Sequence, residues 1–191
     1  MHITSVNIGT ARPLSIEGRR ILSAIGKTPV SGPVNALPMG LAGDEQADPS
    51  VHGGLSKAVY AYPTEHLAWW QQQRQAHGVS LFDETLPPGF MGENLSLSGL
   101  LETEAWVGDE LHFPHCVLRV TEPRQPCYKF NAVMGFNQAG KAMAQSGFCG
   151  FYLAVQTPGA LQAGDAFELR PGPRSLSVAQ AFAGKRWKHM R

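Results

Sequence analysis

Glycine and proline recur along the whole 191-residue chain, and their spacing is the strongest constraint on its fold. The 21 glycines and 14 prolines are spread from end to end rather than gathered in one linker. Because both residues favour turns and interrupt helices, they divide the chain into short segments. Short segments favour a fold built from strands, and we expect few helices.

Six short runs have the alternation or the β-branched and apolar composition of strands. They are residues 2–8, 58–62, 110–113, 116–120, 151–156 and 166–170. Two of them, 110–113 and 166–170, each follow a Gly-Asp pair, which is a hairpin-type turn signal. The recurrence of this signal predicts a mainly β (α+β) fold, a closed or partly closed β-barrel of short strands with a few flanking helices.

Three segments have the boundaries or the pattern of helices, namely 64–77, 137–147 and 175–191. The first begins at Thr64, which can cap its N-terminus, and ends at a His-Gly pair. The last is short and amphipathic, with a basic last turn. We therefore expect one β-barrel domain over residues 1–172 and a short helical tail over 173–191.

Composition excludes several classes of partner. The hydrophobic content of 43% and the charged content of 16% fit a folded globular protein. A formal net charge of +1 argues against a general electrostatic grip on nucleic acid or on an anionic membrane. The apolar run 148–155 is far shorter than the roughly 20 residues of a membrane span, and the first residues lack the pattern of a signal peptide. We expect a cytoplasmic protein.

The three cysteines fit neither a disulfide framework nor a four-cysteine zinc site, because they are odd in number and form no CxxC pair. Cys116 and Cys149 lie in apolar surroundings typical of buried thiols. Cys127 differs, because Arg124 and Lys129 place positive charge beside it, which favours the thiolate. A thiolate is a nucleophile or a ligand for a soft metal. Simple packing under a proline-rich turn stays open as the alternative.

A glycine-rich loop precedes the run 58–62 and contains His52, Gly53, Gly54 and Lys57. Paired glycines let backbone N–H groups turn toward an anion, and a nearby lysine adds charge, so this loop can cradle a phosphate. Its spacing does not match the P-loop. A tight turn in which the histidine contacts a carbonyl is the alternative.

A second loop contains Glu93 and Asn94 in the stretch GENLSLSGL. The amide of Asn94 can donate to and accept from the edge of a heterocycle. The alternative is that both are turn residues. No GxSxG, HExxH or GxGxxG motif supports a serine hydrolase, a zinc protease or a dinucleotide site.

Five motifs in sequence resemble the consecutive motifs of the MOSC family, named for the C-terminal domain of molybdenum cofactor sulfurases. They are LAGDEQAD, VHGGLSKAVYAYP, GENLSLSGL, VGDELHF and TEPRQPCYKF. The resemblance runs from about Met39 to Arg170 and is nearest to the small bacterial branch similar to 6-hydroxylaminopurine reductase. That branch carries a C-terminal three-helix extension, whereas here only 175–191 follow the expected barrel. The resemblance implies a barrel like the β-barrel of pyruvate kinase.

The resemblance also implies a molybdopterin-type molybdenum cofactor and assigns residues to it. Cys127 corresponds to the single protein ligand of the molybdenum, with Arg124 and Lys129 tuning the thiolate. The residues assigned to the pterin phosphate or to the mouth of the site are His52, Gly53, Gly54 and Lys57. The pterin edge is assigned to Glu93 and Asn94.

The implied activity is a molybdenum-dependent two-electron reduction of N-hydroxylated compounds, such as hydroxylamino bases, with electrons from a separate flavin or haem protein. A nearby acid would protonate the departing oxygen. His52 is our candidate for this acid, because imidazole titrates near working pH. The oligomeric state is open, a homodimer included.

Three alternative functions stay open. It could carry a persulfide as a sulfur carrier, with pyridoxal phosphate confined to a partner sulfurase. The chain could instead bind and hand over molybdenum cofactor without any reductase activity. Outside the family, Cys127 with His52 could form a thiol hydrolase, although no third residue stands out to orient the pair.

Overall fold

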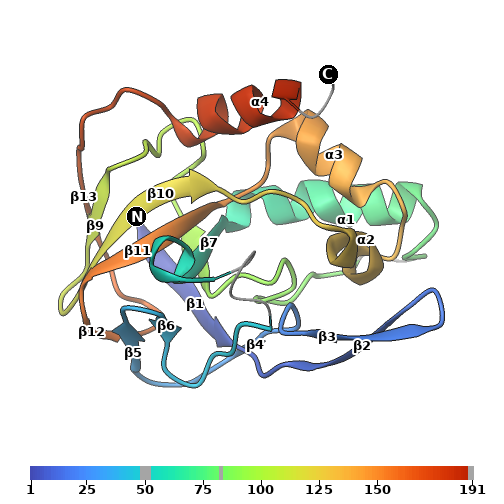
Figure 1. Ribbon diagram of the computed structural model, residues 1–191, viewed down its shortest axis with the longest axis horizontal. Helices are drawn as coiled ribbons and strands as arrows, with labels where there is room; N and C mark the ends of the chain where they lie inside the picture. Colours follow the sequence, from blue (N-terminus) through green and yellow to red (C-terminus); the bar gives the residue numbers. More distant parts are fainter. Residues whose placement is uncertain (48–52, 82–83, 189–191) are drawn as a thin grey trace.

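The computed structural model describes residues 1–47, 53–81 and 84–188, and the side chains of its last helix as far as Gly184. The strands that form its main sheet are β1 (His2–Ile8), β4 (Thr28–Pro29), β7 (Val59–Pro63), β8 (Leu95–Ser98), β9 (Glu110–His112), β10 (Val117–Pro123), β11 (Phe151–Thr157) and β13 (Glu168–Arg170). Their order in space is β13-β9-β10-β11-β7-β8-β1-β4 (Figure 1). Only the pair β7–β8 is parallel; the other pairs of this sheet are antiparallel.

Two smaller sheets lie beside the main one. The first has the order β12-β5-β6, from β5 (Val34–Leu37), β6 (Gly40–Leu41) and β12 (Gly159–Leu161). The second is a hairpin of β2 (Arg12–Ile16) and β3 (Arg19–Ser23), which pair only with each other. Its two-residue turn, Glu17-Gly18, has φ of 49° and 78°. Positive φ at both positions matches the right-handed twist of paired strands.

Four α-helices are present in the described ranges: α1 (Leu67–Ala76), α2 (Tyr128–Met134), α3 (Ala139–Ser146) and α4 (Val178–Lys188). In Figure 1, α1, α2 and α3 gather on one side of the sheet and α4 lies above β10. Two short 3-10 turns, η1 (Leu55–Lys57) and η2 (Thr64–His66), flank β7. Within the described ranges, no helix combines the length and the apolar character needed to span a membrane.

The expected sheet-rich α+β fold with few helices is confirmed, but a closed barrel is not. The main sheet has two ends, β13 and β4. The segment before β13 nevertheless reaches β1, because the Ile3 N–H donates to the Asp165 carbonyl at 2.9 Å and the Phe167 N–H to the Met1 carbonyl at 3.3 Å. The sheet therefore curls, so that the first strand meets a segment from near the end of the chain.

The sequence located six strands of the main sheet, missed the two smaller sheets and misjudged one helix cap. The range predicted for β1 coincides with the observed His2–Ile8. The predicted helix 64–77 divides into η2 and α1, and Thr64 does not cap it. The Thr64 hydroxyl instead donates to the Leu97 carbonyl in β8, at 3.0 Å. This contact joins the helix to the sheet.

The core lies between the sheet and the helices, and its largest fully buried side chains include Trp70, Tyr62, Phe130 and Phe151. The segment expected to form a separate tail contributes to this core, because Val178 and Phe182 of α4 are buried in it. The boundary at residue 172 stays a prediction.

Candidate functional site

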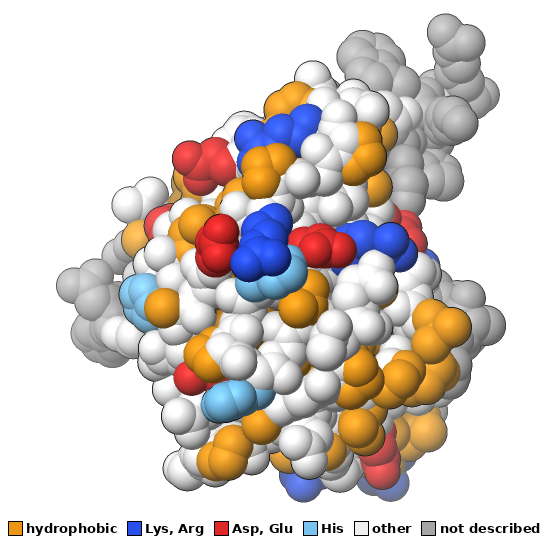
Figure 2. All heavy atoms as spheres, turned by 90° about the vertical axis from the view of Figure 1, so that its left-hand side faces the viewer, with side chains coloured by type: hydrophobic (Ala, Val, Ile, Leu, Met, Phe, Trp, Pro, Cys, Tyr) orange, Lys and Arg blue, Asp and Glu red, His pale blue; other side chains and the backbone are white. Residues whose placement is uncertain are grey.

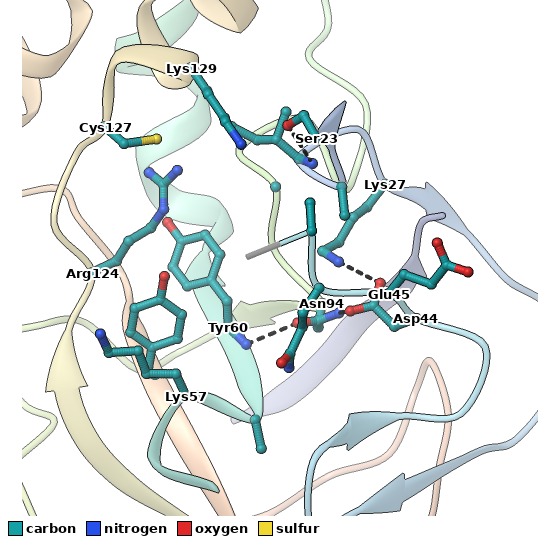
Figure 3. Close-up of a pocket in the computed structure, with 17 residues that line it drawn as sticks. Ser23, Lys27, Asp44, Glu45, Lys57, Tyr60, Asn94, Arg124, Cys127 and Lys129 are labelled. Atoms are coloured by element: carbon teal, nitrogen blue, oxygen red, sulfur yellow. Dashed lines mark hydrogen bonds and ion pairs between the residues drawn. The ribbon is translucent and has the colours of Figure 1, made fainter. Parts of the chain in front are cut away.

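A pocket opens where the loops at one end of the main sheet meet α2 (Figure 3). Its lining comes from segments that are distant in sequence: the end of β3 and the loop after it, the loop 44–47, η1 with β7, the turn before β8, the turn between β10 and α2, and β11. Loops at a sheet end are free of ladder hydrogen bonds, so they can direct polar side chains inward.

Cys127 lies at the wall of this pocket, in extended backbone immediately before α2 (φ −122°, ψ 165°). Cys127 is only partly buried, whereas Cys116 and Cys149 are buried as expected. Burial raises the pKa of the Cys116 thiol to about 11 and raises that of Cys149 well above its ordinary value. These two thiols therefore stay protonated at neutral pH, and Cys127 is the one cysteine that faces the pocket.

Arg124 lies directly beyond β10 and supplies the charge next to this thiol. Its residue is 4% exposed, and Figure 3 shows its guanidinium directed toward Cys127 and the pocket. The guanidinium carbon lies 5.0 Å from the ring centre of Tyr60 and 5.1 Å from that of Phe130, both cation–π distances. Across the described ranges no carboxylate forms an ion pair with Arg124.

The tyrosines around Arg124 do not balance its charge. Burial raises the pKa of Tyr60 well above its ordinary value of 10 and also raises that of Tyr152. Both phenols are therefore neutral at physiological pH. A guanidinium that is buried without an anion is costly, because desolvation penalises the charge. The corner formed by Arg124 and Cys127 is thus prepared for a negative ligand.

Three lysines add to the positive charge of the pocket. Lys27 forms a buried ion pair with Asp44. Lys129 donates from Nζ to the Leu22 carbonyl at 3.0 Å. Lys57 lies 3.9 Å from a carboxylate oxygen of Glu122. With Arg124, four cationic side chains line the pocket, against the two acidic ones of Asp44 and Glu45. The lining therefore favours an anion.

Asn94 lines the pocket, but its amide is occupied by the protein itself. Its Nδ2 donates to Asp44 at 2.9 Å, and its Oδ1 accepts from the Tyr60 N–H at 3.1 Å. Nδ2 also approaches the Asn7 carbonyl at 3.3 Å. These bonds tie β1, β7 and the loop of Asp44 together. In this structure the amide of Asn94 fixes the pocket wall.

Glu93 lies outside the residues that line the pocket and is 1% exposed. Its carboxylate accepts from the Gly89 N–H at 2.7 Å, the Met91 N–H at 3.0 Å and the Ser96 hydroxyl at 2.7 Å. Two donors from the loop before β8 and one from β8 itself therefore converge on it, so it holds this loop against β8. Its assignment to a pterin edge stays a prediction.

The structure describes only part of the glycine-rich loop. His52 lies outside the described residues. Gly53 and Gly54 do not belong to the pocket lining, whereas Lys57 does. The Gly54 N–H donates to Gln46 Oε1 at 3.3 Å, and Gly54 has a φ of 84° that favours glycine. The structure thus brings Lys57, but neither glycine, to the wall that holds Cys127.

The pocket residues that the sequence reasoning missed include Lys27, Asp44, Tyr60 and Tyr152. Asp44 and Tyr60 lie within two of the quoted family motifs, so that signal was available. Lys27 had none, because it meets Asp44 only through the pairing of β4 with β1.

The side chains present suit a metal that brings its own ligands. Within the described ranges, no group of three or more His, Cys, Asp or Glu residues is arranged to hold a bare metal ion. The pocket offers one thiol and several cations instead. A single thiolate with surrounding positive charge fits a soft metal held in an anionic organic cofactor.

The fold and the pocket together define a protein of the MOSC class. The family model of the MOSC domain matches residues 48–168, and the chain belongs to this family. It is 33% identical over 177 residues to the uncharacterized protein YflK of Bacillus subtilis, which covers 92% of this chain and 76% of YflK. It is 35% identical over 161 residues to YiiM of Escherichia coli, covering 84% and 70% respectively.

A fungal protein and a solved structure extend these similarities. A protein of Gibberella moniliformis named reductase is 34% identical over 160 residues, which are 82% of this chain and 28% of that protein. The crystal structure of YiiM from Geobacillus stearothermophilus superposes with a TM-score of 0.76 at 30% identity, covering 100% of this chain and 86% of that one. The shared fold therefore extends over the whole chain.

Proposed function

We propose that the chain binds a molybdopterin-type molybdenum cofactor through Cys127 and reduces N-hydroxylated compounds with electrons from a flavin or haem partner protein. The observation that carries the proposal is the buried Arg124, which has no carboxylate partner among the described residues and points toward the thiol at the pocket wall. Membership of the MOSC family supports it, and so does the similarity to a relative named reductase.

The electrostatics of the pocket explain why an anionic cofactor suits it. A phosphate and a sulfur-rich metal centre are both negative, so they would offset the desolvation of Arg124. The nearby guanidinium also favours the thiolate form of Cys127 over the thiol. Lys57 and Lys129 lie at the same wall and can contact a phosphate oxygen directly.

The proposed reaction converts R–NHOH, two electrons and two protons into R–NH2 and water. The cofactor, when bound, supplies the centre through which the two electrons pass. The chain's own residues would hold the cofactor in place. His52, which lies outside the described residues, remains our proposed proton donor. Full cofactor loading with unaltered turnover of a hydroxylamino base in His52→Ala would remove it from this role.

The deciding experiment is elemental analysis for molybdenum after expression in a host that makes the cofactor. We expect close to one molybdenum per wild-type chain and less than about a tenth of that in Cys127→Ser, since a hydroxyl is a poor ligand for a soft metal. Cys116→Ser is the matched control and should keep its metal, because Cys116 lies outside the pocket. Equal metal in wild type and Cys127→Ser would overturn the assignment.

The same preparation separates the alternatives. Turnover of 6-hydroxylaminopurine with dithionite as a small electron donor supports the reductase. A loaded protein without turnover would indicate a cofactor carrier. An added mass of one sulfur atom on Cys127, with no molybdenum, would indicate a persulfide carrier.

A further inference from the structure

The β2–β3 hairpin is the most basic element beside the pocket. Figure 1 shows it extending away from the main sheet, below α2. Arg12, Arg19 and Arg20 are exposed on it, and Glu17 at its turn is its one acidic residue. A chain with a net charge of only +1 thus places three arginines on twelve residues. Such local charge attracts an acidic partner.

The register of the hairpin shows which residues are presented to solvent. Leu14 pairs with Ile21, and both are partly buried. On the opposite side, Pro13 pairs with Leu22 and Ser15 with Arg20, and all four are exposed. Leu22 is 56% exposed. We call these four residues the hairpin face. It carries Arg20, whereas Arg12 and Arg19 are exposed at positions of the other face of the hairpin.

The hairpin face is joined to the mouth of the pocket. Ser23, at the end of β3, lines the pocket, and Lys129 Nζ bonds to the Leu22 carbonyl at 3.0 Å. Tyr128, between Cys127 and Lys129, is 60% exposed. Arginine, tyrosine and exposed leucine next to an active pocket resemble the core of a protein interface, in which aromatic residues and arginine are enriched.

The face around β9 and β13 differs from the hairpin, because it carries charges of both signs. Around β9 and β13, acidic and basic side chains alternate closely (Figure 2). Two of these pairs are Arg170 with Glu168 at 3.5 Å and His112 with Glu110 at 2.8 Å. Charges of both signs balance on that face, so it attracts neither kind of partner. The hairpin lacks this balance.

We propose that the β2–β3 hairpin, with its three exposed arginines on both faces and the neighbouring Tyr128, is the docking surface of an acidic electron-transfer protein. This inference rests on the proposed function, and it names where the donor binds. Each reduced flavin of the donor gives up two electrons, which with two protons convert one R–NHOH to R–NH2 and water. A second copy of the chain facing its own hairpin would bring three further arginines, and like charges oppose that contact.

The test uses the loaded chain, reduced flavodoxin as an acidic flavin-bearing donor, and dithionite as a donor too small to need docking. The variant is Arg12→Glu/Arg19→Glu/Arg20→Glu. Its matched control, Arg119→Glu/Lys141→Glu/Arg170→Glu, changes the charge equally at exposed positions away from the hairpin. At low ionic strength we expect the hairpin variant to lose at least about tenfold in kcat/KM with flavodoxin, while dithionite-driven turnover is unchanged.

A binding measurement keeps this inference separate from the proposed function. The dissociation constant for oxidised flavodoxin should rise at least about tenfold in the hairpin variant and in Tyr128→Ala, and hardly in the control. If wild type shows no turnover even with dithionite, the proposed function fails, and the binding result still decides the docking surface.

Several results would overturn the docking surface. They are equal flavodoxin affinity in wild type and hairpin variant, no measurable affinity of wild type, a wild-type dimer that the variant loses, and binding to anionic phospholipid vesicles in place of flavodoxin. If the triple variant does not fold, Arg19→Ala and Arg20→Ala provide the same comparison separately, each with an expected loss of about threefold.

Discussion

Two buried charged groups of this molecule, Glu93 and Arg124, differ in whether the protein supplies them with partners. Around Glu93, three donors converge on one carboxylate, and Ser96 continues the bonds to Asn7 at 3.1 Å. Around Arg124, the neighbours are aromatic rings, the thiol of Cys127 and the Met143 sulfur at 4.0 Å, and no carboxylate of the described residues forms an ion pair with it. The first cluster is complete without any ligand, whereas the second is incomplete.

The difference separates residues that build the pocket from residues that use it. A satisfied polar network strengthens the fold, because every buried group has its partner. A buried cation without an anionic partner carries a desolvation cost, which a bound anion would offset. We therefore expect variants of the first cluster to change stability, and variants of the second to change binding.

The largest effect should follow from Glu93→Ala. It leaves the N–H groups of Gly89 and Met91 and the Ser96 hydroxyl without their acceptor. Each such loss costs about 1–3 kcal/mol, so we expect the free energy of unfolding to fall by about 4 kcal/mol. Urea titration measures it. Glu168→Ala, on the surface, should cost less than about 0.5 kcal/mol. A similar cost for both would show that the Glu93 cluster is not structural.

A somewhat smaller loss, about 3 kcal/mol, is expected for Asp44→Asn, which leaves the Lys27 charge buried and unpaired. The side chains of this pair are 7% exposed for Lys27 and 3% for Asp44. The double variant Lys27→Met/Asp44→Asn removes the stranded charge and should recover more than half of the loss. Urea titration of wild type, Lys27→Met, Asp44→Asn and the double variant measures the coupling between the two side chains. If the two single losses simply add in the double variant, the prediction is wrong.

Arg124→Met sharpens the contrast, because it should separate stability from binding. Methionine fills a similar volume without a charge, so the cofactor-free chain should be as stable as wild type, or more stable by up to about 2 kcal/mol. Its molybdenum content should fall at least about tenfold, equivalent to about 1.4 kcal/mol. Elemental analysis and urea titration of the same preparation give both numbers. A variant that unfolds readily yet retains its metal would reverse the roles of the two clusters.

The smallest effect concerns pH. Burial raises the pKa of Glu93 above its ordinary value of 4.5, so the folded chain holds that proton more tightly than the unfolded chain does. The free energy of unfolding should decrease as the pH rises from about 4.5 through the raised pKa, by at most about 1.4 kcal/mol per pH unit. Glu93→Gln cannot ionise and should lose this part of the slope. Parallel curves for both proteins, measured from about pH 4.5 to 7.5, would count against a raised pKa.

Local sequence signals located most strands of the main sheet and the cysteine that lines the pocket. The alternation of residues 2–8 and the Gly-Asp turns before β9 and β13 are short-range features, which the fold preserves. The charge beside Cys127 is equally local, because Arg124 is three residues away. These parts of the fold and of the candidate site could therefore be predicted.

Features with an atypical local signal, or with partners brought together only by the fold, could not be predicted. The hairpin turn places Glu17 at a positive φ that is uncommon for glutamate, so its sequence lacks the usual Asn-Gly or Asp-Gly signal. Helix α2 has only seven residues and no side-chain cap at Cys127, so its sequence lacks the usual start signal of a helix. The role of Glu93 depends on three donors whose convergence only the folded loop reveals.

The order of strands in the main sheet has a consequence for biosynthesis. β11 lies between β10 and β7, so the wall that holds Arg124 joins the wall that holds Tyr60 only after Phe151–Thr157 are in place. A ribosome-bound chain that ends before this strand has the cysteine but no pocket around it. Contacts between such distant segments form late in folding. If the proposed cofactor binds, its insertion would therefore require a chain in which Phe151–Thr157 have already joined the sheet.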